Sequence, residues 1–547
     1  MTDPTTATVA PSSPWHSLVI DNRFTRELPA DPVEGSALRQ VSGAAFSRVD
    51  PVSVPEPRLI GWSDEVGREL GFGAEVADDP ETARILTGDL LLPGSDPHAM
   101  NYGGHQFGNW AGQLGDGRAI ALGEFRGVDG ELRTLQLKGA GPTPYSRRAD
   151  GFAVLRSSIR EFLCSEAMHH LGVPTTRALS LALTGSRVVR DMLYDGNPRP
   201  EPGAVVCRVA PSFLRFGNFQ LPTARDDLDL LRTLLDYTIR HFAPHLGEPT
   251  PETYARWFAE VCEKSCDMVI EWMRVGFVHG VMNTDNMSIH GLTIDYGPYG
   301  WLDDFDPDWT PNTTDAGGKR YRYGFQPRIT QWNLLQLANA IVPAVGDPAP
   351  LEAALNDFAH RYQKGHRAMI RAKLGWQRTD DDEGDDRLVD DLYELLTLTE
   401  TDMTIFFRRL ADVAVQGRPE GADGGGVASG RSVVAEAYYQ PDGIDDALVR
   451  RIDGWFEAYV ARTRTEDRPD VDRRAAMNAV NPKYVLRNYL AQQAIDAAEN
   501  GEYDEIGRLL DLLRRPYDEQ PDRETYAARR PDWARSRPGC SMLSCSS

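Results

Sequence analysis

The sequence predicts an α+β protein in which a β-rich N-terminal half is followed by a mostly helical C-terminal half. Two observations support this class. In the first half, short apolar segments alternate with polar residues and are separated by glycine-containing turns, whereas in the second half apolar residues recur at helical spacing. The chain has 547 residues, 41% of them hydrophobic, which is enough for about two to four structural domains with buried cores.

The expected elements of the first half follow in chain order. Residues 118–138 predict a β-hairpin, because two apolar segments flank the turn Gly127–Gly130. Residues 153–171 predict a helix, because apolar side chains recur at helical spacing and a glycine and a proline follow as stop signals. Further strands are expected at 187–193 and 204–209.

The second half is expected to be helical, with two loops. Helices are predicted over residues 225–243, 251–276, 330–343, 351–374, 387–413, 443–463 and 482–499. The acidic stretch 379–387 and the glycine-rich stretch 416–430 predict loops. The acidic stretch does not match a calcium-binding loop, because Asp385 stands where the required turn glycine would be.

Charge and hydropathy limit the partners of the protein. With 59 Lys+Arg against 81 Asp+Glu the net charge is −22, which opposes nonspecific attraction to nucleic acid or to an anionic membrane. No apolar run approaches the roughly 20 residues that a membrane-spanning helix needs. The N-terminal residues lack the features of a secretory signal or a transit peptide, so we expect a cytoplasmic protein, and we expect it to be a monomer. A nucleotide site would have to be a local basic pocket.

The six cysteines are too sparse for a disulfide framework and favour a reducing compartment. Cys262 and Cys266 lie four residues apart on a predicted helix, but no second pair with metal-binding spacing accompanies them, so a zinc site is not favoured. Cys540 and Cys545 are the two that we expect to be available for redox chemistry.

The segment 279–286, followed by Asp295-Tyr-Gly, is similar to a protein-kinase catalytic loop and its metal-binding motif. In kinases an aspartate two residues after the histidine accepts the proton of the substrate hydroxyl, but here Val281 occupies that position. Asn286 and Asp295 remain suitable ligands for Mg²⁺, which prefers oxygen donors. Because the metal ligands are kept and the usual base is lost, simple γ-phosphoryl transfer is doubtful, and Asp285 is the substitute base.

A glycine-rich segment precedes the predicted hairpin. Residues 102–118 contain six glycines in seventeen positions, which allows backbone N–H groups to approach phosphate oxygens closely, although a structural turn region would have the same composition. Lys138 ends the second hairpin strand and Glu161 lies on the next helix. This order matches the kinase arrangement in which a carboxylate orients a lysine against nucleotide phosphates. An ordinary surface ion pair is the alternative.

Three further features are weaker. Arg208 and Arg215 flank an apolar segment and could grip phosphate by bidentate hydrogen bonds, unless they are ordinary surface arginines. Asp150-Gly151 could form a turn against a nucleotide, but Asp-Gly is a common turn sequence in general. We expect His279 to have a structural role that holds its loop.

Taken together, the chain resembles the selenoprotein O family of protein adenylyltransferases, a pseudokinase-like group of bacteria and mitochondria. The resemblance rests on blocks in the same order along most of the chain, at residues 102–118, 136–141 with 143–146, 154–163, 174–179, 207–212, 279–286, 295–298 and 481–490. It implies a bilobal, protein-kinase-like fold. We therefore expect an N-terminal extension with a β-rich lobe over 1–200, a helical lobe over 201–515 and a flexible tail over 516–547.

The resemblance also implies the activity and the site. The reaction would transfer AMP from ATP to serine, threonine or tyrosine hydroxyls of proteins, with ATP flipped relative to kinases and pyrophosphate as the leaving group. Asp285 would accept the proton, Asn286 and Asp295 would hold Mg²⁺ or Mn²⁺, and Glu161 would orient Lys138. The residues expected to contact ATP are Gly115, Gly117, Arg118, Lys138, Asp150, Gly151, Arg208, Arg215 and Asp295.

The sequence departs from the family pattern at two places. Phe152 follows Gly151 where the family usually has arginine, which weakens the expected contacts of Asp150 and Gly151. Pro311 stands where bacterial relatives often have a cysteine that could pair with a cysteine third from the C-terminus, here Cys545. That disulfide is therefore excluded, which leaves Cys540 as a local partner or two incidental thiols.

Two other functions stay open on the sequence. A kinase acting on a protein or a small molecule could use Asp285 as its base and would transfer the γ-phosphate. An inactive ATP-binding scaffold would bind the nucleotide without transferring any part of it.

Overall fold

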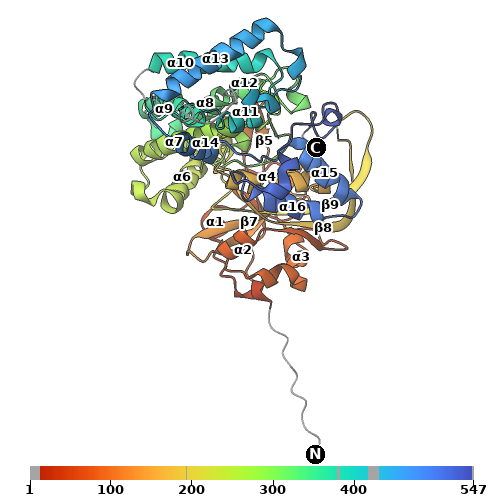
Figure 1. The fold of residues 1–547 in the computed structure, drawn as a ribbon. Coiled ribbons are helices and arrows are strands. Elements are labelled where there is room, and N and C mark those ends of the chain that lie inside the picture. The colour runs from red at the N-terminus through yellow and green to blue at the C-terminus, as the bar shows by residue number, and fades with distance from the viewer. Residues whose placement is uncertain (1–12, 193, 379–381, 417–429, 545–547) are drawn as a thin grey trace, which may run out of the picture.

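The computed structural model describes residues 13–192, 194–378, 382–416 and 430–544. Its strands lie mainly in the first 210 residues and its long helices mainly beyond them, which confirms the α+β class (Figure 1). Over these residues no helix combines the length and the apolar character needed to cross a membrane.

A seven-stranded antiparallel sheet forms the core of the N-terminal half. The strand order is β1-β3-β6-β7-β9-β8-β2. The bounds are β1 Phe46–Arg48, β2 Arg58–Trp62, β3 His98–Met100, β6 Ala119–Arg126, β7 Leu132–Lys138, β8 Arg177–Arg190 and β9 Arg199–Ala210. Two-stranded ribbons are formed by β4 Gly103–Gln106 with β5 Asn109–Gln113, and by β10 Phe277–Val278 with β11 Gly300–Trp301.

The predicted hairpin is confirmed as β6 and β7, and it pairs Ala119 with Lys138 at its open end. The next two strands are longer than expected. The predicted strand at 187–193 begins ten residues earlier, at Arg177, because its first part is buried on both faces and so lacks the alternation that marks a half-exposed strand. The expected lobe boundary at residue 200 falls inside β9.

Most of the helices lie in the second half of the chain. Their bounds are α1 Arg23–Glu27, α2 Asp64–Glu69, α3 Pro80–Thr87, α4 Leu155–His170, α5 Phe216–Ala224, α6 Leu228–Phe242, α7 Pro251–Val275, α8 Gln326–Val345, α9 Ala349–Leu374, α10 Asp382–Leu398, α11 Met403–Leu410, α12 Gly430–Val433, α13 Asp446–Arg464, α14 Asp470–Val480, α15 Asn488–Glu499 and α16 Asp504–Leu513. Helix α4 packs on β8 and β9, and α15 and α16 pack on α4, so these two late helices lie beside the sheet rather than with α7–α14 (Figure 1).

The helix predicted over 387–413 is in fact two helices, α10 and α11. Asp402 ends the connection between them, because its carboxylate caps α11 by accepting a hydrogen bond from the Ile405 N–H at 3.0 Å. The buried Arg487 also pairs with Asp402, at 2.8 Å.

The two predicted loops have different outcomes. In the acidic stretch, residues 379–381 lie outside the described residues, but 382–387 begin α10. Asp385 is buried and pairs with Arg371 at 3.2 Å and with Arg462 at 2.5 Å, so the prediction of a solvated loop is wrong here. Of the glycine-rich stretch, 417–429 lie outside the described residues.

The described part of the C-terminal segment, residues 516–544, is packed, in contrast to the flexible tail that the sequence predicts. Leu543 is buried and continues a short ladder with a loop of the helical half: its N–H donates to Pro311 O at 3.0 Å, and the Thr313 N–H donates to Leu543 O at 2.8 Å. Cys540 is buried too, and burial raises the pKa of its thiol to about 11, which disfavours the thiolate that redox chemistry needs. Cys545 lies outside the described residues.

Candidate nucleotide-binding and catalytic site

The carboxylate of Asp295 is the meeting point of three cations. Its Oδ1 lies 2.5 Å from Arg208 Nη1 and 3.4 Å from Lys138 Nζ, and its Oδ2 lies 2.5 Å from Arg215 Nη1. Burial acts to raise the pKa of Asp295, but the charges of Arg215, Arg208 and Lys138 hold it well below its usual value. Asp295 also has a φ of 58°, a left-handed conformation that is uncommon for a residue with a side chain and is frequent at functional sites.

Lys138 and Glu161 form a buried ion pair at the end of β7 and in the middle of α4. Lys138 Nζ lies 2.6 Å from Glu161 Oε2, and the other carboxylate oxygen of Glu161 lies 3.1 Å from Arg208 Nη1. Because α4 packs against the sheet, the side chain of Glu161 reaches the strand ends where the cations lie. The fold therefore places two acids and three bases in one connected cluster.

Two residues that the sequence analysis missed hold the arginines in place. Gln136, two residues before Lys138, accepts a hydrogen bond from Arg208 Nη2 and donates one from its Nε2 to Asp116 Oδ2 at 3.2 Å. Asp116 lies 3.8 Å from Arg215 Nη2, and burial raises its pKa. The sequence indicated these two residues only by their position, because both lie inside the blocks that contain Gly115–Arg118 and Lys138.

The loop at residues 279–286, the candidate catalytic loop, is anchored by its histidine. His279 is buried and its Nε2 lies 3.0 Å from Ile294 O, which joins the loop to the residue preceding Asp295. Asn286 donates from Nδ2 to Val281 O at 2.8 Å, so its amide oxygen is the atom directed away from that contact. His279 thus has the contacts expected of a structural residue.

Asp285, the candidate base, is buried beside this cluster. Its backbone carbonyl accepts a hydrogen bond from Arg215 Nη1 at 2.8 Å, and its Oδ2 accepts one from Gln106 Nε2 at 3.2 Å. Burial raises the pKa of the carboxyl group to about 6, close to the working range of a general base. Its Oδ1 is buried and has no hydrogen-bond partner within the described part of the chain.

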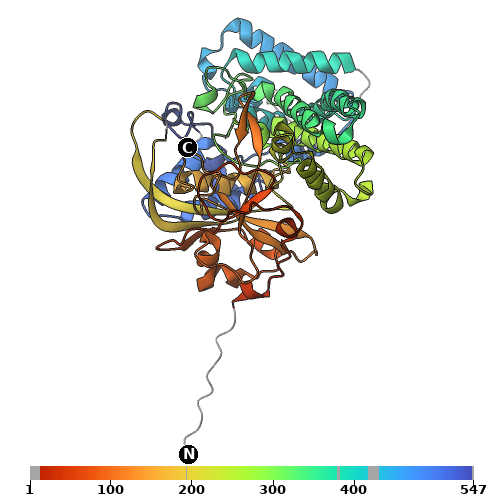
Figure 2. The same ribbon diagram turned by 180° about the vertical axis from the view of Figure 1, so that it is seen from behind.

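The glycine-rich segment divides into two parts. Gly103–Gln113 forms the β4–β5 hairpin, which extends from the sheet toward the helical half (Figure 2). The second part contains Gly115, which has a φ of 66° and on which a Cβ would lie 2.3 Å from the Tyr145 ring. A Cβ on Gly117 would lie 2.8 Å from Tyr145 O. Both glycines are needed for this close packing.

Arg118 follows directly and lines a small cavity together with Lys138, Glu161 and the Asp-x-Gly residues Tyr296 and Gly297. The end of the glycine-rich segment is therefore adjacent to the charged cluster.

The chain is similar to known proteins of one family. The family model described as "Protein adenylyltransferase SelO" matches residues 34–514. The chain belongs to the SelO family of protein adenylyltransferases. Curated relatives named "Protein nucleotidyltransferase YdiU" come from Azoarcus sp. (strain BH72), at 60% identity over 97% of this chain and 99% of theirs, and from Aromatoleum aromaticum, at 58% over 97% and 100%. A third, from Rhodopirellula baltica, is 56% identical over 97% and 99%.

Membership of the SelO family confirms the resemblance and the expectation of a nucleotidyltransferase. Among solved structures, the chain is similar to ROP2 from Toxoplasma gondii, described as a virulence factor with a protein-kinase fold and no enzymatic activity. That match has a TM-score of 0.23 and 12% identity, and it covers 54% of this chain and 87% of that one.

Asp150 and Gly151, which were expected to contact ATP, make no contact with the charged cluster in the described part of the chain. Asp150 pairs with Arg190 at 2.7 Å, and Arg190 Nη2 also donates to Phe152 O at 2.9 Å. Gly151 has a φ of 79°, and a Cβ on it would lie 2.3 Å from the backbone of Pro142. Arg190 thus brings a guanidinium to this turn, next to Phe152.

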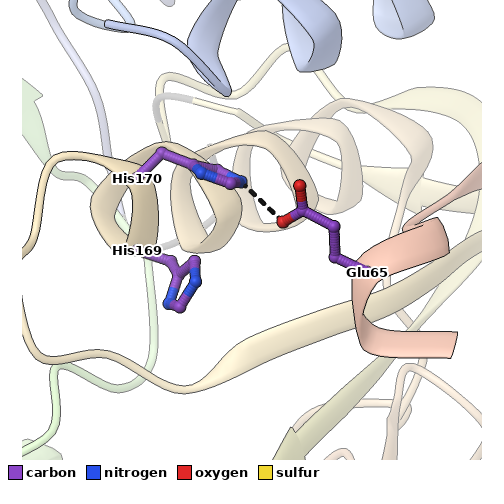
Figure 3. Close-up of side chains that lie close together, drawn as sticks. All are labelled: Glu65, His169 and His170. Carbon is purple, nitrogen blue, oxygen red and sulfur yellow. Dashed lines mark ion pairs between the residues drawn. The ribbon is translucent and has the colours of Figure 1, made fainter. Parts of the chain in front are cut away.

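A second group of metal-type ligands lies away from this site. Glu65 on α2 lies near His169 and His170 at the end of α4, with His170 Nε2 3.0 Å from Glu65 Oε2 (Figure 3). Two arginines already compensate Glu65: Arg177 Nη2 lies 3.5 Å and Arg514 Nε lies 3.8 Å from its oxygens. This group is therefore best explained as an ion-pair network.

Cys262 and Cys266 are buried in the apolar core, where desolvation raises their pKa, as expected for structural thiols.

Proposed function

We propose that this protein transfers AMP from ATP to serine, threonine or tyrosine hydroxyls of other proteins, with Asp285 as the proton acceptor. The observation that carries the proposal is the convergence of Lys138, Arg208 and Arg215 next to a buried carboxyl group whose pKa is raised to about 6. Family membership supplies the two substrates, ATP and a protein.

In this reaction the acceptor oxygen attacks the α-phosphorus as its proton passes to Asp285. A bond forms between the acceptor oxygen and the α-phosphorus, and the bond from that phosphorus to the oxygen bridging to the β-phosphate breaks. Pyrophosphate leaves with the bonding electrons. Lys138, Arg208 and Arg215 would neutralise the charge that develops on the phosphates, and preorganised cations of this kind are a large source of rate enhancement.

The remaining cluster residues would bind and orient ATP. Glu161 would hold Lys138 through the 2.6 Å ion pair, and Arg118 would contact phosphate from the adjoining cavity. Gly115 and Gly117 would shape the segment before it, and Asp150 with Gly151 would contact the nucleotide from the turn that Arg190 holds.

Asn286 and Asp295 would hold Mg²⁺ or Mn²⁺. The donor set fits, because both provide oxygen ligands: the hydrogen bond from Asn286 Nδ2 to Val281 O leaves the amide oxygen as the ligand atom, and the low pKa of Asp295 keeps its carboxylate ionised. A bound divalent cation would add positive charge next to the triphosphate.

We also propose a monomer that does not bind nucleic acid and works in a reducing, cytoplasmic compartment. The net charge of −22 supports the absence of nucleic-acid binding. A reducing compartment is supported by the free, buried thiols of Cys164, Cys207, Cys262 and Cys266.

The test uses ATP labelled at either the α- or the γ-phosphate, incubated with purified protein, Mg²⁺ and a lysate of its own cells. Protein-bound label from the α position only supports AMP transfer. Label from the γ position only would establish the kinase alternative with Asp285 as a phosphotransfer base, and ATP binding without either label would establish the scaffold. Asp295→Ala should abolish transfer, and full turnover by this variant would overturn the site assignment.

A further inference from the structure

The β4–β5 hairpin lies directly on the catalytic loop. The N–H of His105 donates to Thr284 Oγ1 at 2.7 Å, and the side-chain N–H of Gln106 donates to Asp285 Oδ2 at 3.2 Å. The N–H of Phe107 donates to Asn283 Oδ1 at 3.2 Å. Three consecutive hairpin residues therefore contact three consecutive loop residues.

A glycine allows the hairpin to come this close. A Cβ on Gly104 would lie 2.7 Å from Asp285 Oδ1 and 2.9 Å from Asp285 Cβ, so any larger residue would displace either the hairpin or the base. The hairpin is part of the cover that leaves Asp285 only 7% exposed.

Other contacts fix the loop independently of Gln106. Tyr321 OH accepts from the Phe107 N–H at 2.9 Å and donates to Asn283 Oδ1 at 2.6 Å. Thr284 Oγ1 donates to Gln220 Oε1 at 2.7 Å. Removing the Gln106 amide would thus leave the loop anchored while freeing the Asp285 carboxylate.

The two oxygens of Asp285 are in different situations. Oδ2 accepts the Gln106 hydrogen bond, whereas Oδ1 is buried without a partner among the described residues. A buried acceptor without a donor is costly, and a hydroxyl donor would satisfy it. Oδ1 faces the Gly104 backbone, so within the described residues the hydrogen bond from Gln106 to Oδ2 is the side-chain contact that fixes the orientation of the carboxylate.

We infer that Gln106 is a positioning residue for the reaction: its amide holds Asp285 Oδ2 and so fixes the orientation of the carboxylate that accepts the proton beneath the β4–β5 hairpin. The inference rests on the proposed role of Asp285 as the base. Gln106 acts through Asp285 and does not itself exchange a proton.

The test replaces Gln106 with methionine, which keeps the length of the side chain and removes the amide, and with alanine as a second variant. Because correct placement of a general base contributes about 10²- to 10⁴-fold to rate, we expect kcat for AMP transfer to fall by about 10- to 100-fold. The Kd for ATP should change by less than about twofold, because Gln106 has no described contact with Lys138, Arg208 or Arg215. Asn109→Ala, at the exposed first residue of β5 in register with Gln106, is the matched control and should transfer AMP at the wild-type rate.

A double-mutant cycle with Asp285→Asn separates positioning from general structure. If Gln106 acts through the carboxylate, Gln106→Met should lower kcat in the wild-type background and leave the residual rate of Asp285→Asn unchanged. Equal losses in both backgrounds, or wild-type kcat in both Gln106 variants, would overturn the inference while leaving the base intact. Full activity of Asp285→Asn would instead overturn the proposed base.

Discussion

Arg215 joins Asp295 to the loop that carries Asp285: its Nη1 lies 2.5 Å from Asp295 Oδ2. The same nitrogen donates to the backbone carbonyl of Asp285 at 2.8 Å. One guanidinium thus links the candidate metal ligand to the loop that carries the candidate base. Its plane also lies over the Tyr102 ring, 4.6 Å from the centroid, which restrains its orientation.

Replacing Arg215 with alanine should weaken both ATP binding and the fold. Removing one partner of a fully buried ion pair costs about 3–5 kcal/mol, and we expect a smaller loss of about 2 kcal/mol because Asp295 keeps Arg208 and Lys138. Denaturant unfolding measures the stability and calorimetry measures ATP affinity. Arg232→Ala, a change to a surface arginine, is the control, and equal stability of the two variants would contradict the linking role of Arg215.

The rate of AMP transfer should depend on pH through Asp285. A carboxylate accepts a proton only when it is ionised, and the pKa of Asp285 is raised to about 6. The rate should therefore rise as pH increases through about 6 and level off above about 7. A pH profile of kcat measures this, and Asp285→Asn should lose the step near pH 6. A profile that is flat between pH 5 and pH 7 in the wild-type protein would contradict the assignment.

Substituting Gly104 by alanine should impair transfer, because the new Cβ would lie 2.7 Å from Asp285 Oδ1. We expect kcat to fall by at least about tenfold through displacement of the base or the hairpin. Gly112→Ala is a control on the same hairpin, because nothing lies within 4 Å of its Cβ position. It should lose about 1 kcal/mol of stability from its positive φ and little activity.

Cys540 should react slowly with alkylating reagents in the folded protein. Its thiol is buried, and its pKa is raised to about 11, so little thiolate exists near neutral pH. Mass spectrometry after timed iodoacetamide treatment, in native buffer and in denaturant, measures the protection. Equal labelling under the two conditions would show that the packed C-terminal segment opens readily.

Local sequence patterns were sufficient for the elements that have a clear period and clear ends. The β6–β7 hairpin and helices α4, α7 and α9 lie close to their predicted bounds, because each has regular apolar spacing between turn or stop signals. The pattern was misleading over 387–413, where the apolar spacing continues across the break at Asp402 that separates α10 from α11. The pattern was also misleading for the C-terminal segment. This segment has few apolar residues, but its backbone forms hydrogen bonds with Pro311 and Thr313 in a distant loop.

The sequence by itself determined the family, the residue types of the site and the absence of the usual kinase base, because these depend on which side chains occur in which order. Only the tertiary structure decided that Lys138, Arg208 and Arg215 converge on Asp295. It also decided that Gln106 contacts Asp285, which lies 179 positions later in the chain. Such contacts depend on how the sheet, α4 and the hairpin pack against the catalytic loop. Packing brings together residues that local periodicity treats as unrelated.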